Sequence, residues 1–206
     1  MNGSMMKMTI RMLCDTAKSE LRKEVNSYEL EDIISTHAIG AAVAAMASGW
    51  IPGTGSVVAF GIGVTFVCSM YVRLANAMGI TLGKGLIRAV ASAVVADLAA
   101  YIATLLTVAA AVSFIPFFGN MSASTLTAIA NFACVYLAAL IFIKMLGALM
   151  RSGKDISKMS QAEVISAIKR ESKKTDLKGA MKEAKNQFKQ ANANGDLDKP
   201  GFTPEE

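Results

Sequence analysis

The sequence predicts an all-α protein: a membrane helical bundle of two helical hairpins, about four apolar helices, with flanking amphipathic helices. Long apolar segments fill the middle of the 206-residue chain, and charged residues gather at its two ends. Two matching signatures, 64 residues apart, interrupt the apolar segments: Trp50-Ile51-Pro52-x-x-Gly55-Ser56 and Phe114-Ile115-Pro116-x-x-Gly119-Asn120. Because a proline and a following glycine end a helix and reverse the chain, each signature predicts the turn of one hairpin.

The distribution of charge favours burial in a membrane. Hydrophobic residues make up 53% of the chain and charged residues 18%, below the share of about 25% in soluble proteins. Four charged residues lie between Ile33 and Ile143: Arg73, Lys84, Arg88 and Asp97. A soluble domain spreads charge over its whole surface, so this segregation predicts apolar segments in lipid. A soluble apolar bundle wrapped by its own two ends is the alternative.

Residues 1–32 are expected to form an N-terminal region built on an amphipathic helix at about residues 4–25. Its apolar residues recur every three or four positions: Met6, Ile10, Leu13, Ala17 and Leu21. This periodicity is typical of a helix with one apolar face, which lies either at a membrane interface or against the bundle. The region lacks the apolar stretch of a signal peptide, so we expect internal segments to direct insertion. Asn26 and Ser27 are expected to cap the next helix.

Residues 33–150 are expected to form an apolar double-hairpin membrane domain. Its four apolar segments are residues 33–49, 54–72, 86–114 and 122–143. A helix that crosses a bilayer needs about 20 apolar residues, so the first segment is marginal and is either a thin span or a re-entrant arm. Pro52 and Gly55 are expected to form the first turn, and Pro116 and Gly119 the second.

The basic residues beside these segments predict the topology. They lie on the side of the two chain ends: Arg73, Lys84, Arg88, Lys144 and Arg151. Neither hairpin turn carries a charge. The positive-inside rule then places both termini and the loop at residues 73–88 in the cytoplasm, with the hairpins in the inner (cytoplasmic) membrane of a bacterium.

The C-terminal part is polar and basic, and we expect a helical tail over residues 151–194. Ser160 and Glu163 have the spacing of a capping box. A second amphipathic stretch follows, with Leu177, Met181, Ala184 and Phe188 on one face. The many lysines of these helices indicate contact with anionic lipid, with an acidic partner, or with water alone. Residues 195–206 are expected to be disordered.

Two polar residues in the apolar segments are candidates for an intramembrane site. Asp97 lies in the third segment, where a carboxylate is costly in lipid and is expected to face the bundle. It is either part of an ion or proton pathway or a hydrogen-bonded residue at a helix contact. Asp97 could pair with His37, the one histidine of the chain, or with Arg73, or it could accept hydrogen bonds from Ser, Thr or Tyr71. Small residues at Gly40, Ala44 and Gly63 predict close contacts between helices.

No catalytic, cofactor-binding or metal-binding residues are predicted. Gly83 and Lys84 resemble the end of a phosphate-binding loop, but Gly85 stands where that loop requires Ser or Thr. Cys14, Cys68 and Cys134 lack the spacing of a metal or redox site. We therefore expect a protein that is not an enzyme and that has no cofactor.

The residues after the first turn carry a family resemblance. Met70-x-x-x-Leu74-Ala75-x-x-x-Gly79 follows Ile51-Pro52 and precedes a second hairpin. This order resembles the domain-of-unknown-function 697 family, YcjF-like apolar helical modules that accompany GTPases. The resemblance covers about residues 30–150 and implies a membrane module that serves a GTPase in trans. This chain lacks the acidic residue that relatives commonly have after Ile-Pro.

The sequence therefore predicts an integral membrane protein that acts as an anchor or interaction module, for a GTPase or for envelope machinery. Its expected partners are the lipid bilayer, a GTPase or another protein, and further copies of itself, but not nucleic acid. An oligomeric pore or small transport protein is one alternative. A soluble helical bundle that inserts into membranes when triggered is another.

Overall fold

All regular secondary structure is helical over the part of the chain that the structure, a computed structural model, describes: residues 4–48, 55–113 and 123–198. No strand occurs in these ranges, which confirms the predicted all-α class. Seven α-helices and two short 3-10 helices follow one another: α1 (Met5–Leu21), α2 (Ser27–Ala47), α3 (Gly55–Ala77), α4 (Lys84–Ser113), α5 (Ala123–Arg151), η1 (Ile156–Lys158), α6 (Gln161–Lys174), α7 (Leu177–Ala193) and η2 (Asp196–Asp198).

Local signals set several helix ends where the sequence predicts them. The Asn26 side chain caps α2 by accepting a hydrogen bond from the backbone N–H of Tyr28. Ser160 and Glu163 form the predicted capping box at the start of α6. Gly55 is the first residue of α3. The predicted turn residues Pro52, Pro116 and Gly119 lie outside the described residues.

Helix α5 is the centre of the bundle and contacts all six other α-helices. Residues 131–143 are buried without a break, so this stretch of α5 is enclosed around its whole circumference. On the α3 side, the ring of Tyr71 stacks on Phe142 with a centroid distance of 4.0 Å. The Tyr71 hydroxyl donates to the carbonyl oxygen of Ala138 at 3.0 Å, so its polar atom is satisfied inside the core.

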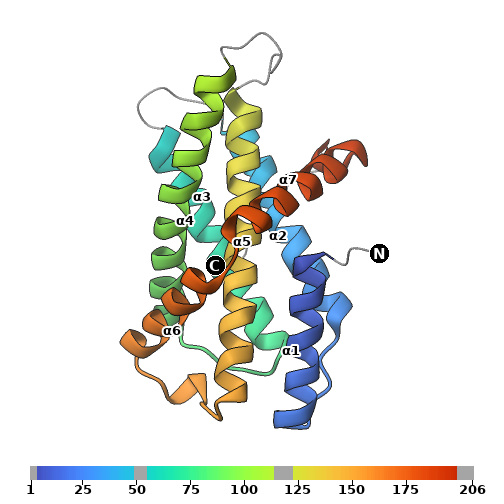
Figure 1. Cartoon of the computed structure of the whole chain (residues 1–206), viewed down its shortest axis with the longest axis vertical. Helices are drawn as coiled ribbons and strands as arrows, with labels where there is room; N and C mark the ends of the chain where they lie inside the picture. Colours follow the sequence, from blue (N-terminus) through green and yellow to red (C-terminus); the bar gives the residue numbers. More distant parts are fainter. Residues whose placement is uncertain (1–3, 49–54, 114–122, 199–206) are drawn as a thin grey trace.

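The two ends of the bundle differ (Figure 1). At one end, which we call the tip end, α4 finishes and α5 begins. At the other, the base end, α5 finishes, and the amphipathic helices α1 and α6 lie beside it. Helix α7 runs obliquely across α5 between these two ends. The amphipathic helices α1, α6 and α7 therefore cover the base end and the middle of the bundle.

Three helices in the described part are long and apolar enough to cross a membrane. They are Ser27–Ala47, Lys84–Ile102 and Ser124–Arg151, and an 18-residue window in each has a mean hydropathy of 1.2, 1.6 and 2.3, respectively. The first is the least apolar of the three, in line with its marginal length in the sequence. The predicted segment at residues 54–72 is tested only from Gly61 on, because the side chains of residues 55–60 are not described.

The predicted small-residue contacts are largely present. Gly63 lies where α3, α4 and α5 meet: a Cβ added there would be 3.3 Å from Cγ1 of Val95 and 3.8 Å from Sγ of Cys134. Gly40 is buried in α2, and Ala44 is half-buried against the core. Gly63 thus allows two neighbouring helices to approach α3 closely.

We expect the substitution Gly63→Leu to destabilise the bundle by about 1–3 kcal/mol, because the larger side chain overfills the contact of three helices. Gly61→Leu is the matched control, since nothing lies within 4 Å of a Cβ at Gly61 and leucine favours the helix. The free energy of unfolding in detergent micelles measures both effects. Equal stability of the two variants would contradict the close contact.

Candidate functional site

The side chain of Asp97 is exposed on the outer surface of α4. The expectation that it faces the bundle interior is therefore wrong. The buried face of α4 is taken by larger apolar side chains: Ile87, Val90, Val94, Val95, Leu98 and Ile102. Arg88, Ala96 and Ala100 of α4 are also exposed. Burial of the branched apolar residues decides the orientation of α4, and the carboxylate is left where solvent can reach it.

His37, by contrast, is completely buried between α2 and α3. Its Nδ1 lies 2.6 Å from the carbonyl oxygen of Ile33, and its Nε2 lies 3.2 Å from the hydroxyl of Ser69. A carbonyl can only accept, so Nδ1 carries the proton and Nε2 accepts from Ser69. His37 thus joins two helices as a hydrogen-bonded core residue, in a different environment from Asp97.

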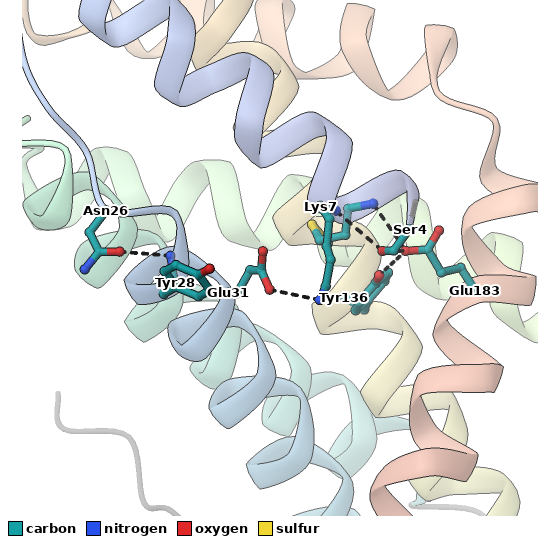
Figure 2. A network of polar contacts seen from close by, with 8 residues as sticks. Ser4, Lys7, Asn26, Tyr28, Glu31, Tyr136 and Glu183 are labelled. Carbon is teal, nitrogen blue, oxygen red and sulfur yellow. Dashed lines mark hydrogen bonds and ion pairs between the residues drawn. The ribbon is translucent and has the colours of Figure 1, made fainter. Parts of the chain in front are cut away.

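A polar junction joins the N-terminal and C-terminal helices to the central helix (Figure 2). We define it as the side chains of Ser4, Tyr136 and Glu183 with the backbone N–H groups of Met5 and Met6. The Glu183 carboxylate of α7 accepts hydrogen bonds from Met5 N at 2.8 Å and Met6 N at 3.2 Å. The hydroxyls of Ser4 and Tyr136 also donate to it.

The position of this carboxylate follows from helix electrostatics. The first turn of α1 has unpaired backbone N–H groups and no acidic residue of its own. A negative charge placed there is stabilised by the helix dipole. Burial raises the pKa of the Glu183 carboxyl, but the donors at Ser4, Tyr136, Met6 and Met5 outweigh this and lower the pKa overall. Glu183 is therefore ionised at neutral pH.

Beside the junction lies a polar cavity of about 340 Å³. Lys7 and Glu31 form an ion pair at its edge, with Nζ and Oε2 3.5 Å apart. Ser4 and Tyr136 of the junction also line it. No group of three potential metal ligands occurs among the described residues. The oxygens at the junction are already engaged by hydrogen-bond donors, so its evident role is to hold α1 and α7 on α5.

Helix α7 presents only positive charge to the outside. Its exposed lysines recur at helical spacing: Lys178, Lys182, Lys185 and Lys189. Glu183 is the one acidic residue of α7, and it points inward into the junction (Figure 2). In the described part of the chain, none of the four lysines forms an ion pair. We call these four residues the lysine stripe.

Sequence reasoning missed the junction, because its residues are about 180 positions apart at the extreme. One signal was present in the sequence. Glu183 is adjacent to Ala184 and three residues beyond Ala180, which places it beside the apolar face of α7 instead of opposite it. An acidic residue at such a position indicates a specific partner inside the fold.

A comparison with known proteins finds no matching protein family, no matching curated protein and no matching solved structure. The resemblance to the domain-of-unknown-function 697 family therefore stays an expectation.

We expect Glu183→Gln to lower the free energy of unfolding at neutral pH by about 1–3 kcal/mol, because it removes the charge that strengthens the hydrogen bonds to α1 and α5. Chemical unfolding in micelles measures this. Glu20→Gln, at an exposed position of α1, is the control and should change stability by less than about 0.5 kcal/mol. An equal loss of unfolding free energy in both variants would contradict the role of Glu183 in holding α1 and α7 on α5.

The stabilisation by Glu183 should depend on pH in one direction. Its pKa is lower in the folded protein than the value of about 4.3 in an unfolded chain. The contribution of ionised Glu183 to the free energy of unfolding is therefore complete above about pH 4.3. It is lost as the pH falls through the pKa of Glu183 in the folded protein. The difference in unfolding free energy between wild type and Glu183→Gln should shrink on acidification from pH 7 to pH 3. A constant difference would show that ionisation is irrelevant.

Proposed function

We propose that the protein is a non-enzymatic membrane anchor whose two hairpins enter the bilayer tip end first and from one side. The observation that carries this proposal is the distribution of charge along the bundle. The sequence has no charged residue at positions 48–60 and 98–143. The base end and the middle are covered by the charged outer faces of α1, α6 and α7 (Figure 1).

The described surface supports insertion by the tip end alone. Among the described side chains, the exposed large hydrophobic ones are Met8, Met12, Tyr28 and Val72. A surface in contact with lipid would expose many more. Further large apolar residues are available for lipid contact in the sequence at and before the second turn, such as Leu105, Leu106, Phe117 and Phe118.

Helix α7 limits the depth of insertion. Phe188 of α7 packs edge-on against Phe132, with ring centroids 5.7 Å apart. Phe132 lies nine residues into α5, about 14 Å from its start at a rise of 1.5 Å per residue. Placing a lysine at the bilayer centre costs about 2.5–3.5 kcal/mol. While α7 stays packed on α5, the hairpins therefore reach about one leaflet of a hydrocarbon core roughly 30 Å thick.

Asp97 supports the same limit from the other side of the bundle. From this exposed carboxylate to the end of α4 at Ser113 the helix rises about 24 Å, less than the core thickness of roughly 30 Å. These distances favour re-entrant hairpins over four complete spans. Both chain ends then lie on one side of the membrane, which we place in the cytoplasm by the positive-inside rule.

The lysine stripe lies on the helix that would rest at the membrane surface. Basic residues near an anionic membrane contribute roughly 1 kcal/mol each, so the stripe adds electrostatic attraction to the apolar insertion. The base end, formed by α1, α6 and the end of α5, remains in water and is free to bind a protein. The family resemblance supports a GTPase as that partner.

The enclosure of α5 supports a second candidate, a bundle that inserts when triggered. Its residues 131–143 can reach lipid only after a covering helix leaves. Extraction of cell membranes with alkaline carbonate separates the two candidates. A constitutive anchor stays with the membrane without any trigger, whereas the triggered bundle is recovered in the soluble fraction.

A pore is the weaker alternative, because exposed Asp97 could line a channel only between α4 helices of several copies.

Trp50, the one tryptophan of the chain, reports directly on the tip end. In vesicles, we expect its emission to shift to the blue and to be quenched by lipids brominated on their acyl chains, because the first turn lies among those chains. Aqueous iodide should quench it weakly. Strong iodide quenching without quenching by brominated lipid would overturn tip insertion.

A charged substitution provides the matched control for this measurement. Phe117→Lys places a charge at the second turn and should reduce flotation with vesicles and the quenching of Trp50. Ala162→Lys adds the same charge at an exposed position of α6 and should leave both unchanged.

A further inference from the structure

A cavity of about 230 Å³ lies between α1, α5 and α6 at the base end of the bundle. Three cations and one carboxylate line it: Lys144 and Arg151 of α5, and Lys174 and Glu171 of α6. Met12, Leu13 and Ile143 form an apolar wall. The cavity is therefore amphipathic, with an excess of positive charge.

The carboxylate is already neutralised by its own helix. Oε1 of Glu171 lies 3.1 Å from Nζ of Lys174 and 3.8 Å from Nε of Arg170. The Glu171 side chain is only 10% exposed, so these charge-assisted contacts are screened less than surface pairs. Glu171 consequently contributes little negative charge to the cations of α5.

Lys144 and Arg151 form no ion pair with any carboxylate of the described residues. Lys144 is half-buried, and its ammonium donates only a long hydrogen bond, 3.5 Å, to the neutral hydroxyl of Thr175. Arg151, in the last turn of α5, is favoured by the helix dipole. Lys144 lies two turns earlier, so this effect does not reach it. An anion in the cavity would compensate its partial desolvation.

Gly147 makes room for the two cations to approach one another. Lys144 and Arg151 are seven residues apart and share one face of α5. A Cβ added at Gly147, midway between them, would lie 3.3 Å from Nη1 of Arg151. The guanidinium therefore folds back along the helix over Gly147, toward Lys144.

We propose that this cavity binds a phosphate group through Lys144 and Arg151. A guanidinium offers paired donors that match phosphate oxygens, and an ammonium adds a point charge. The cavity is smaller than the range of roughly 300–1,000 Å³ typical of drug-sized ligands, which suits a compact anion. The group is carried either by a free phosphate compound or by a phospholipid molecule taken out of the bilayer, whose glycerol backbone contacts Met12 and Leu13. The proposal does not depend on insertion of the hairpins.

The test is isothermal titration calorimetry of the full chain in zwitterionic micelles, with inorganic phosphate in one arm and short-chain phosphatidic acid in the other. The cavity variant is Lys144→Gln with Arg151→Gln. The matched control, Lys154→Gln with Lys169→Gln, removes the same charge at exposed positions that neither line the cavity nor belong to the lysine stripe. Wild type and control should bind equally, and the cavity variant should bind at least about tenfold more weakly.

Comparable binding in both arms identifies a free phosphate compound as the ligand, and clearly tighter binding of phosphatidic acid identifies a lipid headgroup. Failure of wild type to bind either probe, or equal binding by the cavity variant, overturns the proposal. If the cavity variant loses helical circular dichroism, Arg151→Gln alone decides, because this exposed side chain can change without disturbing the core. Unchanged affinity in that variant likewise overturns the proposal.

Discussion

The enclosure of α5 is the constraint on which the rest of the structure depends. A helix with an 18-residue window of mean hydropathy 2.3 must be covered there on every side, either by lipid or by protein. Here protein covers it over residues 131–143. The apolar helices α2, α3 and α4 supply part of the cover, and the amphipathic helices α1, α6 and α7 supply the remainder. The need to bury one helix therefore explains why polar and apolar helices share a single bundle.

The polar junction follows from this arrangement. Helices α1 and α7 meet on α5, and their contact brings the unpaired N–H groups of Met5 and Met6 beside Glu183. A carboxylate there satisfies those groups and complements the dipole of α1. Because the carboxylate is directed inward, the charged residues on the outer face of α7 are all lysines. The interaction of Glu183 thus holds α1 and α7 on α5, and it leaves only positive charge on the outer face of α7.

Local features of the fold could be predicted from the sequence, and long-range ones could not. The Asn26 cap and the Ser160–Glu163 capping box depend on residues close in the chain, and both are present. Gly63 was predicted as a contact because small residues allow close approach whatever the partner. The interior position expected for Asp97 is wrong because the expectation rests on the cost of a carboxylate in lipid, whereas the branched apolar residues of α4 decide which face is buried. The cavity at Lys144 could not be predicted from the sequence, because it forms between three helices, α1, α5 and α6, that are far apart in the chain.

The junction also sets an order of events during synthesis. Glu183 is made 32 residues after the end of α5 at Arg151, which at 5–20 residues per second takes roughly 2 to 6 s. During that interval, the face of α5 that Phe188 later contacts has no cover from α7. The most apolar of the described helices can thus meet a membrane beside the ribosome before α7, which limits its depth, has packed on it. Synthesis itself gives the hairpins a period in which lipid meets no competition from α7.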